Sequence, residues 1–266
     1  MPDFSTVEDT LFVPMLGRIY ASEQFPNILN DQKALELKPQ LPKDLKGQDT
    51  QTQYTLMASA VRSTNMDRYI RNFMTREPEG VVVQLGCGLE TTFYRDDNQK
   101  TVWYEVDLPD VIEYRTKLLG PSDRDRYIAA DAFGEEWIQK VRADYPTEPV
   151  LVTASGLFYY FDEKTVLKLF KSLKNYGNIE IVFDTVNSTG MKQMSKYMKQ
   201  VGHEEASMYF YVDKAQDVAD KIGGSVLNEE PYYAHTEKKG LKFMTSTSMR
   251  VSDKCMMVKM VHLKLN

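Results

Sequence analysis

The chain has 266 residues, of which 42% are hydrophobic and 27% are charged, a composition typical of a globular protein with a sizeable core. The formal net charge is −5 and no basic block is present, which argues against a partner that is nucleic acid or an anionic membrane. Because the sequence shows no bilayer-length apolar run, no signal-peptide pattern and only two cysteines, we expect a cytoplasmic protein without a disulfide framework or metal site.

The N-terminal part of the sequence is predicted to be helical. Residues 38–49 are polar and contain two prolines, which is typical of a surface loop. Apolar residues then recur at spacings of three and four over residues 56–73, and this amphipathic pattern stops near Pro78. We therefore expect residues 1–78 to form a helical cap and residues 79–266 to form the main body of one structural domain.

Five short apolar segments follow, and helical patterns separate them. The expected strands are residues 81–85, 103–108, 126–131, 149–155 and 179–186. Strands that alternate with helices predict parallel pairing through right-handed crossovers, and strands that are apolar on both faces predict helices on both sides of the sheet. The clearest helix is expected between Asp162, as its N-cap, and Gly177.

The C-terminal part is predicted to complete the sheet. A helical insertion over about 188–225 follows the fifth strand, at a place where a lid would lie. Two closing strands are expected in LKFMTSTSM, residues 241–249, and in CMMVKMVHLKL, residues 255–265. Because few residues separate them, they should form a hairpin in which one member is antiparallel. The prediction is thus an α/β fold with a mostly parallel sheet of seven strands.

A loop with two glycines, Gly86 and Gly88, follows the first expected strand. In open α/β sheets, ligands bind beyond the carboxyl ends of the strands. The dinucleotide fingerprint needs a third glycine where Thr91 stands, and a P-loop would end in Gly-Lys-Ser/Thr, which is missing. The loop therefore favours a smaller nucleoside over a nicotinamide dinucleotide or a nucleoside triphosphate.

Acidic residues follow the next two expected strands. Asp107 ends the second strand, where a carboxylate accepts hydrogen bonds from ribose hydroxyls. Asp131 ends the third strand, and its side chain or the neighbouring backbone could recognise an adenine edge. Either acid alone could be a helix cap. A glycine loop followed by these two acids is the usual arrangement for S-adenosylmethionine on a Rossmann-like sheet.

Four segments together resemble the leucine carboxyl methyltransferase family. They are QLGCGLETTFYR, WYEVDLPDVIEYR, AADAF and TASGLFYYF, and the resemblance extends from about Thr10 to Phe183. The family includes protein phosphatase carboxyl methyltransferases and tetracenomycin-type O-methyltransferases of polyketide pathways. The resemblance implies a Rossmann-like class I methyltransferase fold, with S-adenosylmethionine as cofactor and S-adenosylhomocysteine as product.

The resemblance also implies which residues hold the cofactor. Arg62 corresponds to an arginine that pairs with the methionine carboxylate, and we expect Arg95 to pair with Glu90 and brace the loop. One position departs from the family, because Ser155 stands where a glutamate is usual, and this puts a protein C-terminus as substrate in doubt. The predicted cofactor-binding residues are Arg62, Gly86, Gly88, Asp107, Asp131, Ala132 and Ser155.

Methyl transfer requires a nucleophile held in line with the methyl group in a site without water. A carboxylate needs no general base, whereas a phenol or enol does. His203 and Tyr160 are the catalytic candidates. Methionine and aromatic side chains suit an apolar or aromatic substrate, and an arginine could neutralise an acidic one. The predicted substrate contacts are Arg18, Tyr160, Met194 and Tyr197.

The predicted function is an S-adenosylmethionine-dependent O-methyltransferase that acts on a carboxylate or hydroxyl of a small organic, polyketide-like molecule. Three alternatives stay open. The acceptor could be a protein C-terminus. The chain could be a non-catalytic homologue that binds the cofactor, which Ser155 allows. A nicotinamide-dependent enzyme is the third, against which the missing glycine argues. The oligomeric state is left open.

Overall fold

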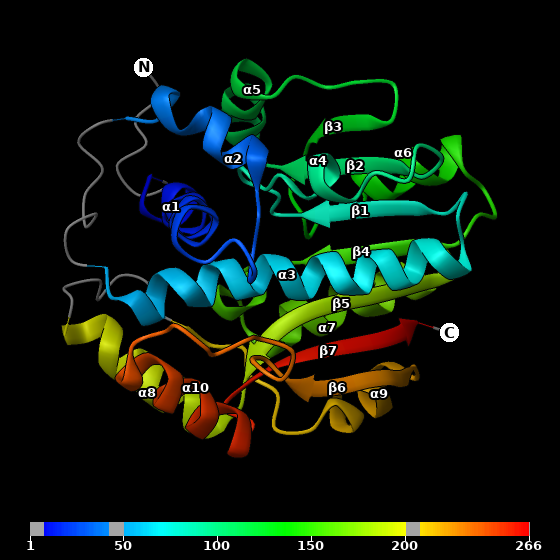
Figure 1. Cartoon of the computed structure of the whole chain (residues 1–266). Helices are drawn as coiled ribbons and strands as arrows, with labels where there is room; N and C mark the ends of the chain where they lie inside the picture. Colours follow the sequence, from blue (N-terminus) through cyan, green and yellow to red (C-terminus); the bar gives the residue numbers. More distant parts are fainter. Residues whose placement is uncertain (1–7, 43–50, 201–207, 266) are drawn as a thin grey trace.

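The computed structural model describes residues 8–42, 51–200 and 208–265, and its centre is a sheet of seven strands in the order β3-β2-β1-β4-β5-β7-β6 (Figure 1). Strands β1 to β5 pair in parallel, and β7 runs antiparallel to both of its neighbours, β5 and β6. The predicted fold class is therefore confirmed. The strands are β1 (Val81–Leu85), β2 (Val102–Asp107), β3 (Asp125–Ala129), β4 (Val150–Ala154), β5 (Ile179–Val186), β6 (Ser225–Pro231) and β7 (Val258–Leu265).

Helices cover both faces of the sheet, because successive side chains of a strand point to opposite sides. In β1, Val81 and Val83 belong to the apolar cluster that includes α6, α7 and α9, whereas Val82 belongs to the cluster that includes α3. The helices are α1 (Glu8–Gln24), α2 (Gln32–Leu37), η1 (Lys38–Gln40), α3 (Gln53–Arg76), α4 (Thr92–Asp96), α5 (Pro109–Leu118), α6 (Glu136–Asp144), η3 (Phe158–Tyr160), α7 (Glu163–Lys174), α8 (Ser188–Gln200), α9 (Ala215–Ile222) and α10 (Phe243–Lys254).

The N-terminal helices lie beside the glycine loop. Leu11 and Met15 of α1 share an apolar cluster with α2 and with Leu89 of that loop. Helices α1 and α3 approach closely at Gly17, where a Cβ atom would lie 2.6 Å from the Leu56 carbonyl oxygen. Because α3 also packs directly on the sheet, the boundary near residue 78 between a cap and a main body stays a prediction.

The prediction for the last two strands was half wrong. Residues 241–249 lie mostly in α10, where Thr245, Met249 and Ser252 are buried at helical spacing while Phe243 and Met244 are 79% and 73% exposed. The strand that pairs with β7 on the side away from β5 is instead β6, which the sequence analysis missed. Its sequence, SVLNEEP, lacks an apolar run because β6 is an edge strand of the sheet.

The described part of the insertion after β5 contains helices α8 and α9. Helix α9 packs on the sheet through Ala215, Val218 and Ile222. This leaves α8 as the part of the insertion to which the lid prediction applies.

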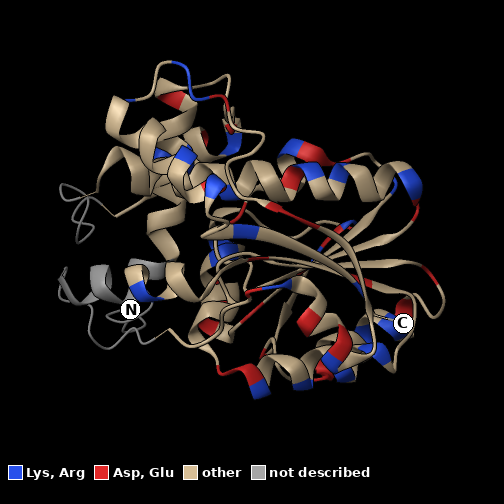
Figure 2. Cartoon of the chain, turned by 90° about the horizontal axis from the view of Figure 1, so that it is seen from below, with Lys and Arg blue, Asp and Glu red and all other residues tan. Residues whose placement is uncertain are grey.

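Charged residues of both signs are interspersed along the helices, whereas the strands are mostly uncharged (Figure 2). Within the described ranges, no helix has the length and apolarity needed to cross a membrane.

Candidate functional site

The loop after β1 adopts a backbone conformation that favours glycine. Gly86 and Gly88 have φ angles of +61° and +50°, in the left-handed region. A Cβ atom on Gly86 would also lie 3.1 Å from Cδ1 of Leu157. The Gly86 amide donates to the Val106 carbonyl oxygen at 2.9 Å, which holds the loop against the end of β2. The two glycines are therefore required by the loop conformation itself.

Asp107 lies at the end of β2, directly beside this loop. Its Oδ2 accepts a hydrogen bond from the Gly88 amide, and its Oδ1 accepts one from the Leu108 amide, each at 2.8 Å. Burial raises the pKa of Asp107 above its usual range, against the effect of these two amides. The structure therefore brings Gly86, Gly88 and Asp107 together, as the order of the motifs predicted.

The residues after β3 lie at the same edge of the sheet. Asp131 is exposed, and its Oδ1 accepts a hydrogen bond from the Phe133 amide at 2.9 Å. Ala132 is buried, and its carbonyl accepts from Nε1 of Trp137 at 3.1 Å. Leu108, which the sequence analysis did not select, is 52% exposed at the end of the neighbouring strand.

Arg62 of α3 lies at the end of β4. Its Nε donates to Oδ2 of Asp184 at 2.9 Å, and this carboxylate is fully buried. Although burial opposes its charge, Asp184 and three nearby tyrosines hold the pKa of Arg62 well above its usual range. Ser155, directly after the last residue of β4, is half-buried. The predictions that Arg62 and Ser155 bind cofactor are not tested by these contacts.

A buried ion-pair network joins α1, α2, α3 and α4 to the glycine loop. Arg95 of α4 contacts Asp31 at 2.6 Å, Asp67 at 2.8 Å and Glu90 at 3.0 Å. Its predicted pairing with Glu90 is confirmed. Arg18 lies 3.1 Å from Glu90 and 3.3 Å from Asp31, and it is only 1% exposed. Against the effect of burial, the two arginines hold the pKa of Glu90 well below its usual range.

These contacts give Arg18 a structural role. Its Nη2 also donates to the Leu89 carbonyl oxygen at 2.6 Å, so the guanidinium is used within the fold. A substrate contact from Arg18 stays a prediction.

Arg115 of α5 braces the glycine loop from behind, and the sequence analysis missed it. Its Nη1 donates to the carbonyl oxygens of Gly88 at 3.1 Å and Glu90 at 2.7 Å. Its Nη2 lies 3.4 Å from Glu105, and both side chains are fully buried. The available signal was Glu105 itself, because a charge inside an apolar strand needs a partner.

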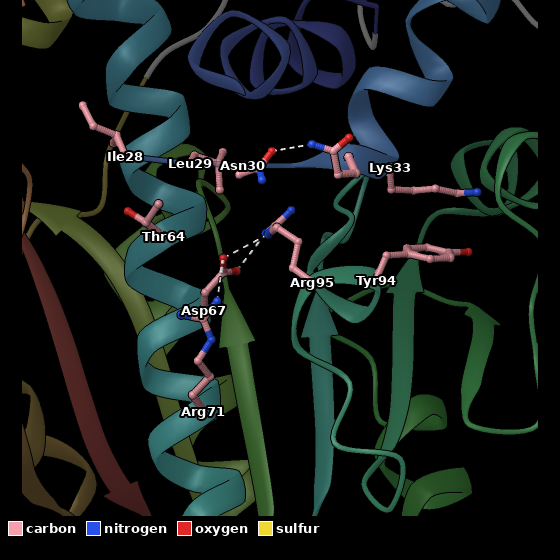
Figure 3. Close-up of a pocket in the computed structure, with 10 residues that line it drawn as sticks. Ile28, Leu29, Asn30, Lys33, Thr64, Asp67, Arg71, Tyr94 and Arg95 are labelled. Carbon is pink, nitrogen blue, oxygen red and sulfur yellow. Dashed lines mark hydrogen bonds and ion pairs between the residues drawn. The ribbon is translucent and has the colours of Figure 1, made fainter. Parts of the chain in front are cut away.

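A cavity of about 420 Å³ opens between α2, α3 and α4. In Figure 3, Asp67 and Arg95 point toward one another at its wall, and Arg71 lies beside Asp67. None of the residues predicted to bind the cofactor lines it. The cavity is thus beside the ion-pair network. Its lining residues are Ile28, Leu29, Asn30, Gln32, Lys33, Thr64, Asp67, Arg71, Tyr94 and Arg95.

The remaining candidates lie around α8 and the end of β4. Tyr160 is 37% exposed, and burial raises its pKa despite the nearby Arg62. Met194 packs against a small cluster that contains Tyr159 and Val186. Tyr197 lies in α8 with its side chain outside the described part, and His203 lies outside the described residues. The catalytic roles of Tyr160 and His203 stay predictions. Among the described residues, no cluster of His, Cys, Asp and Glu could hold a metal ion.

The strand order, the antiparallel β7, the glycine loop after β1 and the acid after β2 define a class I methyltransferase. Residues 9–174 match the sequence pattern described as leucine carboxyl methyltransferase. The chain belongs to this family.

Similar proteins agree with this assignment. The tetracenomycin polyketide synthesis O-methyltransferase TcmP of Streptomyces glaucescens is 26% identical over 226 residues, which cover 84% of this chain and 82% of TcmP. A Mycolicibacterium smegmatis protein, assigned as an S-adenosyl-L-methionine-dependent methyltransferase, is 28% identical over 64% of this chain and 63% of its own length. A Thermobifida fusca crystal structure, assigned as a methyltransferase, superposes with a TM-score of 0.59 at 12% identity over 94% of both chains. The predicted methyltransferase class and cofactor are confirmed at the level of the family.

Proposed function

We propose that this chain transfers the methyl group of S-adenosylmethionine to an oxygen of a small organic acceptor, a carboxylate or a hydroxyl. The observation that carries the proposal is the contact between Asp107 and the glycine loop. The carboxylate at the end of β2 accepts from the Gly88 amide at 2.8 Å, so the acid and the loop form one unit at the carboxyl edge of the sheet. This unit is suited to a nucleoside whose ribose meets the acid and whose chain crosses the loop.

Three parts of this edge would hold three parts of the cofactor. Asp107 would bind the ribose hydroxyls, the Asp131–Ala132 segment would meet the adenine, and Arg62 would pair with the carboxylate of the amino-acid part. When bound, the sulfonium supplies an electrophilic methyl group. The protein would then need only to orient the acceptor oxygen and to exclude water.

A small acceptor is favoured over a protein for two reasons. TcmP, named for polyketide synthesis, is similar over most of both chains. In addition, Ser155 is an uncharged residue at the position where the family usually has a glutamate, which puts a protein C-terminus as acceptor in doubt. A carboxylate acceptor would need no base, and a phenol acceptor could use Tyr160 or His203. Methylation of a protein C-terminus is the alternative, which the family's description supports.

The first test is isothermal titration of the purified protein with S-adenosylhomocysteine and, separately, with NAD. We expect micromolar affinity for the first and no binding of the second. The Gly86→Val variant should bind neither ligand, because its side chain would strain the loop and contact Leu157. The Gly120→Val variant is the matched control. Gly120 also has a positive φ, but its Cβ position is open.

The second test separates the acceptor classes. The protein and S-adenosylmethionine are incubated with aromatic carboxylic acids, with phenols and with peptides that end in a free leucine carboxylate, and mass spectrometry detects a gain of one methylene mass. Methylation of an aromatic acid or phenol supports the proposal. Methylation of the peptides alone would replace it with the protein-terminus alternative. Cofactor binding without any transfer would favour a non-catalytic homologue.

A further inference from the structure

A single buried carboxylate organises the carboxyl ends of β4 and β5. Asp184 of β5 accepts three hydrogen bonds: from Nε of Arg62 at 2.9 Å, from the Gly156 amide at 2.7 Å and from the Tyr159 hydroxyl at 2.9 Å. The side chain of Asp184 is fully buried. A buried carboxylate that accepts hydrogen bonds from three different groups is rigidly held.

The partners of Asp184 come from segments far apart in the sequence. Arg62 lies on α3, 122 positions before Asp184, and Gly156 and Tyr159 belong to the turn that follows β4. Ala154 pairs with Phe183 in the register of β4 and β5, so the turn begins directly beside Asp184. The carboxylate therefore fixes the arginine relative to the edge of the sheet.

The guanidinium of Arg62 also lies against the backbone of Gly156. A Cβ atom at this position would be 2.8 Å from Nη1 and 3.1 Å from Cζ, and Gly156 has a φ of +70°. Any other residue would displace the arginine. Arg62 nevertheless stays partly open, because its side chain is 24% exposed whereas Asp184 is not exposed at all.

A guanidinium has five N–H donors in a rigid plane. When Asp184 takes the Nε–H, the orientation of this plane is set. The two terminal nitrogens lie near the Tyr232 hydroxyl and carry four further N–H groups, which is enough for a second, bidentate acceptor. Without Asp184, the long side chain would have to lose its rotational freedom when the ligand binds.

We propose that Asp184 is a positioning residue, which sets the guanidinium of Arg62 to receive the amino-acid carboxylate of the bound cofactor. This inference rests on the proposed function and adds to it. Asp184 does not touch the cofactor. Its effect is confined to the part of the ligand that Arg62 contacts, and the adenosine part is held elsewhere, by the glycine loop and Asp107.

Two ligands separate a positioning role from a general structural one. S-adenosylhomocysteine carries the amino-acid carboxylate, whereas 5′-methylthioadenosine has the same nucleoside and sulfur without it. We expect Asp184→Asn and Arg62→Met each to lower affinity for S-adenosylhomocysteine by about tenfold or more and affinity for methylthioadenosine by less than about threefold. The double variant should lose no more than the Arg62→Met variant.

Asp96→Asn is the matched control, because Asp96 is also buried and paired with an arginine, Arg71, but lies in α4. It should leave the ratio of the two affinities unchanged. Arg62→Lys keeps the positive charge without the planar fork, and we expect it to lose affinity for S-adenosylhomocysteine as Arg62→Met does. This variant provides the test if Asp184→Asn does not fold.

The outcomes distinguish the two levels of the argument. If the unaltered protein binds neither ligand, the proposed function fails. If it binds both, and Asp184→Asn either keeps its affinity for S-adenosylhomocysteine or loses both affinities equally, the positioning role is wrong. If Asp184→Asn does not fold and only Arg62→Lys can be measured, unaltered affinity of Arg62→Lys for S-adenosylhomocysteine overturns the positioning role.

Discussion

Asp107 has two carboxylate oxygens, and each accepts one backbone amide. A carboxylate oxygen can accept more than one hydrogen bond, so ribose hydroxyls can be added to these contacts. We expect Asp107→Ala to weaken binding of S-adenosylhomocysteine by roughly 1.5–3 kcal/mol, the contribution of hydrogen bonds to a charged group. Isothermal titration measures this, with Asp110→Ala, an exposed acid in the first turn of α5, as the control. Equal loss in both variants, or none in Asp107→Ala, would reject the ribose role.

Individual residues differ in how far the sequence predicts their contacts. The pair formed by Arg95 and Glu90 could be predicted, because the two residues lie five positions apart in the same motif. The contacts of Arg18 with Glu90 and of Arg62 with Asp184 could not, because these residues lie 72 and 122 positions apart. An arginine in a helix pattern gives no sign of whether it faces solvent or a buried acid. Only the packing of α1 and α3 on the sheet decides this.

Helices α1 to α4 depend on the ion-pair network around Arg95. Truncation of a buried ion-pair partner leaves charges uncompensated, and we expect Arg95→Met to lower the free energy of unfolding by about 3–5 kcal/mol. Chemical denaturation measures this loss. Lys117→Met is the control, since it removes an exposed pair with Glu113 and should have a much smaller effect. Similar losses in the two variants would show that the network adds no particular stability.

Glu180 of β5 contacts side chains of both α3 and β7. It accepts two hydrogen bonds from Arg76, at 3.0 and 2.7 Å, and lies 2.9 Å from Nε2 of His262. Although burial would raise it, these partners lower the pKa of Glu180 to about 2. A folded-state pKa below the unfolded value means that the stabilisation is present above about pH 4.5 and is lost as the pH falls toward 2.

We therefore expect Glu180→Gln to be less stable than the unaltered protein by roughly 1–3 kcal/mol at pH 7. The difference should shrink below about pH 4.5, and urea denaturation from pH 7 to pH 3 measures it. Glu163→Gln, which breaks an exposed pair with Lys221, is the control with a small effect throughout. A difference that stays constant over this range would contradict the assignment.

Elements with strong apolar patterns were predicted well, and the others were not. Every residue of β1, β4 and β5 is buried, and these strands stand out as β-branched runs. The Asp162 side chain caps α7 by accepting from the Thr165 amide at 2.8 Å, as predicted. Strand β6 is only partly buried and carries two glutamates, so it has no such signal. Helix α10 was mistaken for a strand because the apolar residues in so short a segment fit both the helical and the strand periodicity.

The molecule as a whole should become more stable when the cofactor site is filled. A ligand that binds only the folded state adds about 2.7 kcal/mol at a concentration 100 times its Kd. For a chain of this size, that corresponds to an increase in Tm of roughly 5–10 °C. We expect this increase with S-adenosylhomocysteine in a thermal denaturation assay. The same concentration of NAD should leave the Tm unchanged, and equal shifts with both ligands would contradict the assigned cofactor.

Strand β7 lies between β5 and β6, although both of these neighbours come earlier in the chain. During synthesis on the ribosome, β5 and β6 therefore emerge before the segment that joins them, and the sheet cannot close until residues 258–265 have left the exit tunnel. Until then, β5 has one unpaired edge made of eight residues that are buried in the finished fold. Such an edge pairs readily with other chains. A nascent chain arrested before residue 258 should therefore aggregate or recruit chaperones, although it already contains every residue that we propose to bind the cofactor.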